Sequence, residues 1–259
     1  MRFKSIFFLI LLLLAFSVPA QAHEWLLKAT PSAPKKGDKV KLELMATHYF
    51  NRSEEAEPVQ DVAAQLIQKG QTTDLKIVEN PDQAALDLMA EFTMPDDGPA
   101  WIYGHRLGQT WSYTPDGSVP GAKADLAPEV AAQVTSTSKT VKFTKLLLNP
   151  SPADQTFAQP LGHLFEIVPL DNPAGLKAGD EIRVKALYGG KPLITPIYAT
   201  YTDFSGEMMT FAFYTESTEA EPKVKISAPG LWLIRARHTV KLADGANYNT
   251  MAILMFEVK

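Results

Sequence analysis

Residues 39–50, KVKLELMATHYF, alternate between more apolar and more polar side chains with a period of two. This pattern is typical of a β-strand that is buried on one face. The apolar series consists of Val40, Leu42, Leu44, Ala46, His48 and Phe50. The stretch therefore predicts a half-buried strand that carries an imidazole near its end.

The same period recurs along the chain. It predicts a strand over residues 181–188 and a hairpin formed by residues 231–240 and 247–258, with a turn at Asp244-Gly245. Helical periodicity is weak, and only residues 126–134 suggest a short helix. Nineteen prolines and fifteen glycines separate strands of ordinary length. We therefore expect an all-β chain of the sandwich type.

The two halves of the chain resemble each other. Residues 36–42 (KGDKVKL) match residues 178–184 (AGDEIRV), and each half has a later strand with a tryptophan, Trp101 or Trp232. The repeat predicts two β-sandwich units in tandem, 23–150 and 157–259, with a proline-rich boundary near residues 149–160. Independent use of a common Gly-Asp turn is the alternative explanation.

Residues 1–22 have the pattern of a signal peptide. Arg2 and Lys4 precede the apolar residues 6–16, and Ala20-Gln21-Ala22 provides a small-x-small cleavage site. The apolar run is short for a membrane span, although an uncleaved anchor is an alternative. Cleavage would make His23 the first residue of a secreted chain, without stable insertion in a membrane.

Composition excludes several classes of protein. Loss of residues 1–22 leaves 237 of 259 residues, and removing Arg2 and Lys4 leaves 23 basic against 29 acidic residues, a formal net charge of −6. The basic residues are interspersed, so we expect no nucleic-acid partner. There is no cysteine, which excludes disulfides and thiolate metal ligands.

Motifs of catalysis are few. Residues 23–27 (HEWLL) begin like a zincin helix, but Leu27 stands where the second histidine is required. The sequence has no Walker loop, no glycine-rich dinucleotide fingerprint and no Gly-x-Ser-x-Gly elbow. We therefore expect a binding protein rather than an enzyme.

The five histidines are the best candidates for a site. An N-terminal His23 would offer its α-amine, with a reference pKa of about 7.7–8.0, and its ring Nδ1 to one metal ion. His48 and His238 each lie in the apolar series of a strand, and His105 ends an aromatic-rich segment. A buried neutral imidazole needs a hydrogen-bond partner or a metal. His23, His48, His105 and His238 are thus the predicted metal ligands, and satisfied core histidines are the alternative.

Other residues are weaker candidates. Glu24 is a possible oxygen ligand, and His163 ranks last among the histidines. Trp101, Tyr103, Trp111 and Tyr113 form either part of the core or an exposed platform for a sugar ring. Two loops are expected, the acidic residues 51–58 and residues 114–138. They are solvated connections or covers over a binding site.

Several segments resemble the family named DUF4198, over nearly the whole mature chain. They are residues 22–26 (AHEWL), 47–50 (THYF), 166–170 (EIVPL), 188–193 (YGGKPL) and 228–238 (APGLWLIRARH). The resemblance implies an Ig-like fold and a periplasmic component of a nickel or cobalt uptake system. It carries over His23, His48 and His238 as ligands, and His105 less securely. Thr47 stands where glycine more often precedes the histidine.

Together these observations predict two tandem Ig-like β-sandwich units that bind a divalent transition metal, nickel or cobalt first, in the periplasm and pass it to a membrane transporter component. Copper is the competitor, because an N-terminal amine and imidazole suit Cu(II), which tops the divalent affinity order. Two rival functions remain open. One is a carbohydrate- or protein-binding module that uses the aromatic cluster, and the other is a copper enzyme with an N-terminal histidine brace.

Overall fold

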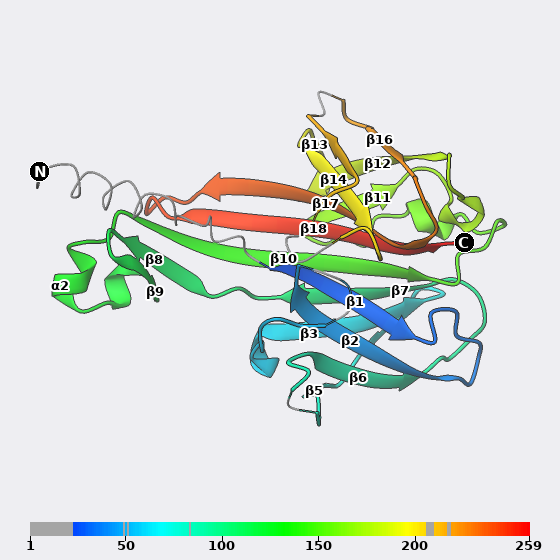
Figure 1. Ribbon diagram of the computed structural model, residues 1–259, viewed down its shortest axis with the longest axis horizontal. Helices are drawn as coiled ribbons and strands as arrows, with labels where there is room; N and C mark the ends of the chain where they lie inside the picture. Colours follow the sequence, from blue (N-terminus) through cyan, green and yellow to red (C-terminus); the bar gives the residue numbers. More distant parts are fainter. Residues whose placement is uncertain (1–22, 49, 51, 83, 206–209, 217–218) are drawn as a thin grey trace, which may run out of the picture.

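The computed structural model describes residues 23–48, 50, 52–82, 84–205, 210–216 and 219–259. The predicted signal peptide, residues 1–22, lies outside the described residues. In the described part of the chain, the strands form three sheets of four, ten and four strands, drawn in Figure 1.

The first small sheet, which we call the N sheet, consists of β1 (Glu24–Thr30), β2 (Lys39–Thr47), β6 (Leu88–Thr93) and β5 (Ile77–Glu79), in that order. The second small sheet, the C sheet, consists of β11 (Phe165–Pro169), β12 (Glu181–Tyr188), β13 (Lys191–Leu193) and β16 (Lys223–Lys225). The strand predicted at 181–188 is present as β12, and the strand predicted at 39–50 is present as β2, which ends at Thr47, so that His48 follows the strand.

The large sheet, the central sheet, contains strands from both halves of the chain. Its main path is β15 (Phe213–Thr215), β14 (Ile197–Tyr201), β17 (Gly230–Lys241), β18 (Asn247–Val258), β10 (Ser136–Leu148), β7 (Ala100–Arg106), β3 (Val62–Gln68) and β4 (Gln71–Asp74). Strand β8 (Thr110–Thr114) pairs with β10 and with β9 (Gly117–Pro120). The predicted C-terminal hairpin is present as the antiparallel pair β17–β18.

Side chains of the central sheet alternate between two hydrophobic cores. On β18, Met251, Ile253 and Met255 pack in the core with the N sheet, whereas Ala252, Leu254 and Phe256 pack in the core with the C sheet. Because successive side chains of a strand point to opposite faces, the small sheets cover opposite faces of the central sheet. The chain is an all-β protein with two sandwich cores, as predicted.

The connection between the two halves differs from simple tandem units. Strand β10 ends just before the predicted boundary at 149–160, and it pairs in parallel with β18 at the C-terminus, for example Leu147 with Phe256. Each core therefore contains residues from both halves. Parallel pairing joins segments far apart in sequence, and local periodicity carries no signal for it.

The internal repeat is visible in matching turns before β2 and β12. Gly37 and Gly179 have φ values of 87° and 105°, in the left-handed region that favours glycine. The carboxylates of Asp38 and Asp180 accept hydrogen bonds from the backbone N–H of Lys35 and Lys177, at 2.9 and 3.0 Å. The two small sheets thus begin with the same local structure.

Helical structure is limited. Within the predicted 126–134 segment the helix α2 spans Pro128–Ala131, and the short 3-10 helices are Val59–Asp61, Lys123–Asp125, Thr156–Ala158 and Pro173–Gly175. Among the described residues, no helix has the length and apolar character needed to cross a bilayer.

Candidate metal centre

Strand β1 pairs with β2 along one edge, and side chains of the central sheet bind its other edge. The ammonium of Lys142 donates to the His23 carbonyl, and the Thr144 hydroxyl donates to the Trp25 carbonyl. Two residues farther along, the Leu27 N–H donates to the Met255 sulfur at 3.5 Å. Lys142 and Thr144 are 2% and 1% exposed. These buried polar groups therefore serve mainly to donate hydrogen bonds to backbone carbonyls at the edge of β1 that does not pair with β2.

Glu24 belongs to the structure rather than to an open site. Its side chain is buried and forms ion pairs with Arg235 and Arg237, the latter at 3.2 Å. Arg235 also lies over the rings of Tyr198 and Phe211, 4.5 and 4.3 Å from their centroids. The carboxylate that sequence analysis considered as a metal ligand is thus neutralised by two guanidinium groups.

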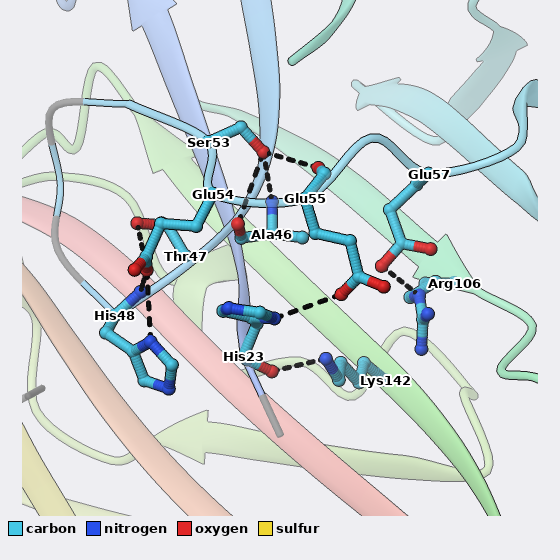
Figure 2. A network of polar contacts seen from close by, with 10 residues as sticks. All are labelled: His23, Ala46, Thr47, His48, Ser53, Glu54, Glu55, Glu57, Arg106 and Lys142. Atoms are coloured by element: carbon cyan, nitrogen blue, oxygen red, sulfur yellow. Dashed lines mark hydrogen bonds and ion pairs between the residues drawn. The ribbon is translucent and has the colours of Figure 1, made fainter. Parts of the chain in front are cut away.

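The acidic loop after β2 folds back along the end of that strand (Figure 2). The Ser53 hydroxyl accepts from the Ala46 N–H at 3.0 Å and contacts the carbonyls of Ala46 and Glu55. Ala46 and Glu55 also form an isolated antiparallel bridge. This arrangement holds the side chains of Glu54 and Glu55 beside the two histidines.

Glu54 fixes the orientation of His48. Its carboxylate accepts from the His48 backbone N–H and lies 3.0 Å from His48 Nδ1. Burial alone would raise the pKa of Glu54, but the hydrogen bond from the His48 N–H and the nearby imidazoles outweigh burial, so the pKa lies below its usual value. Glu54 is therefore a carboxylate at neutral pH and occupies Nδ1 of the ring.

Glu55 binds the other histidine. The distance from its Oε2 to His23 Nδ1 is 3.0 Å, and this hydrogen bond is the main reason why the pKa of Glu55 lies below its usual value. The rings of His23 and His48 are 4.5 Å apart between centroids, with an interplanar angle of 52°. Figure 2 shows the two imidazoles beside the carboxylates of Glu54 and Glu55.

His23, His48 and Glu54 form a cluster whose potential ligand atoms all lie within 4.8 Å of one another. We call it the His23 site. Each of these residues is partly exposed. Nδ1 of His48 faces Glu54, and its Nε2 is buried with no hydrogen-bond partner among the described residues. A carboxylate on one ring nitrogen and a free second nitrogen is the arrangement found in metal-binding histidines.

Two cations, Arg106 and Lys142, lie near the carboxylate of Glu55. Arg106 forms an ion pair with the buried Glu57, with 2.5 Å between Nε and Oε1. Burial, and secondarily the charge of Arg106, lowers the pKa of Lys142 to about 8, although nearby glutamates oppose the shift. Lys142 contacts the backbone of His23 rather than its ring, so it anchors the residue without occupying a ring nitrogen.

The structure does not bring His105 and His238 to this cluster, contrary to the predicted ligand set. On β7 the side chain of His105 lies on the same face as Trp101 and Tyr103, and it stacks on Phe143 at 4.8 Å. His238 packs against Tyr188 at 4.7 Å. Both therefore lie on the C-sheet side of the central sheet, whereas His23 and His48 lie on the N-sheet side. Sequence periodicity indicates that a side chain faces a core but not which core.

Two of the four aromatic residues in the predicted platform belong to the core. Trp101 and Tyr103 are 4% and 8% exposed and pack against the C sheet. Trp111 is partly buried, and Tyr113 is exposed. The four rings thus do not form one exposed surface on which a sugar could stack.

Sequence analysis did not assign the acidic partners of the histidines. It identified residues 51–58 as an acidic loop that could cover a site. Glu54 and Glu55 follow His48 by six and seven residues, which is close enough for the loop to return to the strand end. The spacing of these acidic residues after a histidine at the end of a strand was the signal by which the sequence could have identified them.

These features define a class: an all-β protein of two sandwiches that share a central sheet, with a histidine–carboxylate cluster at the start of its first strand. Residues 20–240 match the family model described as a domain of unknown function, DUF4198. The chain belongs to this family. No curated protein matches it.

Two solved structures match the chain at low similarity. One contains the fibronectin(III)-like modules of Clostridium thermocellum CbhA, with 12% identity, a TM-score of 0.21, and coverage of 90% of this chain and 94% of that one. The other is the full ectodomain (Ig1–Ig3) of mouse nectin-like molecule 4, with 13% identity, a TM-score of 0.22, and coverage of 91% and 65%. These values carry no functional argument.

Proposed function

We propose that the protein binds a divalent transition metal in the periplasm, nickel or cobalt first, and delivers it to a membrane uptake system. The observation that carries the proposal is the convergence of His23, His48 and Glu54 within 4.8 Å. Transport, the metal and the compartment are parts of this proposal, which requires no chemistry on a substrate.

The donor set favours a transition metal over calcium or magnesium. Imidazole nitrogen suits zinc, copper and nickel, whereas calcium and magnesium prefer oxygen donors. Two imidazoles and one carboxylate provide both a preference for such metals and a charge that offsets the cation. The same set does not separate nickel, cobalt, copper and zinc, so availability and geometry select among them.

Maturation would complete the site. Cleavage after Ala22 would free the amine of His23, and amine and Nδ1 together would close a chelate ring on one ion. His23 Nδ1 now contacts Glu55, so the metal would replace that hydrogen bond. Lys142 holds the carbonyl of His23 and therefore limits the motion of this terminal residue.

Partial exposure of the site suits a carrier. The side chains of His23, His48 and Glu54 are 25%, 15% and 24% exposed, so an ion can enter and a partner protein can reach it. A resident structural metal would more often have four ligands in a closed site. Reversible capture and handover fit the open cluster better.

The first experiment tests the terminal amine. Isothermal titration with Ni²⁺, Co²⁺, Cu²⁺ and Zn²⁺ compares the chain that begins at His23 with a form that keeps one extra alanine before it. We expect the extension to weaken binding at least tenfold, about 1.4 kcal/mol. Equal affinity of the two forms would show that the amine is not a ligand.

The second experiment tests the imidazoles. His48→Ala should weaken metal binding at least tenfold, about 1.4 kcal/mol, because it removes the free Nε2 beside His23. His238→Ala is the matched control on the opposite face of the central sheet and should leave the affinity unchanged. Weakening by both substitutions alike would contradict the His23 site.

Copper bound in a histidine brace is the second candidate, and the His23–His48 ring pair is the observation that favours it. The titration separates the candidates. A strong preference for Cu²⁺ beyond the general affinity order, with T-shaped coordination by spectroscopy, would favour copper.

A further inference from the structure

A second candidate site lies at the end of the central sheet that carries the C-terminus (Figure 1). It is a cavity of about 370 Å³ between β1 and the ends of β10 and β18, bounded on one side by the turn after β14. Its volume falls near the lower end of the range for small-ligand pockets, roughly 300–1,000 Å³. It does not include the residues of the His23 site.

One wall is an apolar row interrupted by a carboxylate. Leu231 and Glu257 are register partners on β17 and β18, and Leu148 on β10 lines the same cavity. Glu257 continues the face of β18 that carries Met251, Ile253 and Met255, all buried. A partly buried carboxylate thus occupies the position where the alternation predicts another apolar side chain.

Three charged side chains line the cavity. Among the described residues, Lys28, Asp203 and Glu257 have neither an ion pair nor a side-chain hydrogen bond, although all three line the cavity. Burial raises the pKa of Glu257, and the nearby Lys259 opposes this shift. A carboxylate that loses water without gaining a partner is destabilised, and an incoming cation would relieve that cost.

We propose that this cavity binds a free α-amino acid with an apolar side chain. The ammonium group pairs with Glu257, the carboxylate pairs with Lys28, which also lines the cavity, and the side chain covers Leu148 and Leu231. Charges of both signs around an apolar surface match a zwitterion better than a simple anion or a sugar. Asp203 adds negative charge at the rim. This site is independent of the metal-binding proposal.

The test uses three probes with the same branched carbon skeleton and the full mature chain in the presence of EDTA, because amino acids also chelate metals. Calorimetry compares L-leucine, 3-methylbutylamine and 4-methylpentanoate. We expect leucine to bind in the millimolar range or better, the amine at least fivefold more weakly, and the acid not measurably. No binding of leucine, or equal binding of leucine and the amine, would overturn the proposal.

Substitutions locate the binding. Glu257→Gln should weaken leucine binding at least tenfold, and Lys28→Met should remove the advantage of leucine over the amine. Glu91→Gln changes an exposed carboxylate on β6 and is the matched control. If Glu257→Gln does not fold, the Lys28→Met result decides alone. Leucine binding that is unchanged in Lys28→Met, or lost in His48→Ala, would also refute the assignment.

Discussion

The two halves of the molecule begin with similar local structure, but the histidine at the start of each half has different neighbours. Each small sheet starts with a histidine shortly before its first strand, His23 before β1 and His163 before β11, and each then has the same Gly-Asp turn. His23 meets a second imidazole and two carboxylates at a partly exposed edge. His163 instead stacks on Tyr103 at 3.4 Å, with nearly parallel planes.

The difference comes from the neighbours of each histidine rather than from the repeat. After β2, the acidic loop returns to the strand end and places Glu54 and Glu55 on the rings. On the other face, the carboxylate that acts electrostatically on His163 is Glu166, which is already paired with Lys145. Under the proposed function, His23 would therefore exchange its partner for a metal, whereas His163 stays stacked on Tyr103.

The two faces of the central sheet also use buried lysines differently. Lys142 faces the N sheet and donates to a backbone carbonyl at the free edge of β1. Lys145 faces the C sheet and pairs with Glu166 at 2.9 Å, and both side chains are 3% exposed. Leu161 and Gly162 add backbone hydrogen bonds to Glu166. The N-sheet side uses its buried polar groups to hold a strand edge, and the C-sheet side uses them to hold a loop.

The largest effect is expected from breaking the buried Lys145–Glu166 pair on the C-sheet side. Glu166→Ala would leave the ammonium of Lys145 buried without a counter-charge and would release the loop that carries His163. We expect the free energy of unfolding to fall by about 3–5 kcal/mol, measured by urea denaturation at pH 7. Metal affinity at the His23 site should not change in the remaining folded protein.

The matched control for this variant is Asp171→Asn. Asp171 pairs with Arg183 on the surface at 2.7 Å, with side chains 34% and 47% exposed. Exposed pairs contribute roughly 0–1 kcal/mol, so this change should be small. Equal losses in the two variants would mean that burial of the Lys145–Glu166 pair has no special role.

A smaller effect is expected at the free edge of β1. Thr144→Val keeps the shape of the side chain but removes the donor to the Trp25 carbonyl, which stays buried without a partner. We expect a loss of about 1–3 kcal/mol in the free energy of unfolding. Thr140→Val, four residues earlier on the same face of β10, is the control and should cost clearly less. No difference between them would show that β1 does not depend on this contact.

Much of the fold follows from the sequence because alternation with a period of two directly reports a strand with two different faces. This pattern located β2, β12 and the β17–β18 hairpin, and the Gly-Asp turns disclosed the repeat. It did not disclose the parallel pairing of β10 with β18, whose partners are more than a hundred residues apart. The apolar run at 251–256 was the remaining hint, because strands buried on both faces lose their alternation.

The candidate site was predicted in part. The cleavage pattern identified His23, and the strand pattern identified His48, but neither could tell which face of the central sheet would receive His105 and His238. The role of Lys142 was also hidden, because a lysine in a strand ordinarily marks a position where the side chain is exposed to solvent. Its burial depends on the free edge of β1, a strand more than a hundred residues away in the sequence.

The smallest effect concerns the pH response of the C-sheet side. Burial, reinforced by Lys145 and His105 and opposed by Glu166, lowers the pKa of His163 to about 4, against about 6.5 in an unfolded chain. Between these values the unfolded chain binds a proton that the folded protein does not, so stability falls as the pH falls from about 6.5 towards 4. We expect a loss of about 1 kcal/mol between pH 7 and 5 from this partly exposed ring, after discounting for solvent screening. His163→Phe keeps an aromatic ring against Tyr103 without a titrating group, and should lessen the change in the urea midpoint over this range. If His163→Phe loses as much stability between pH 7 and 5 as the parent chain, His163 does not differ from an exposed histidine. That result would remove the contrast with His23.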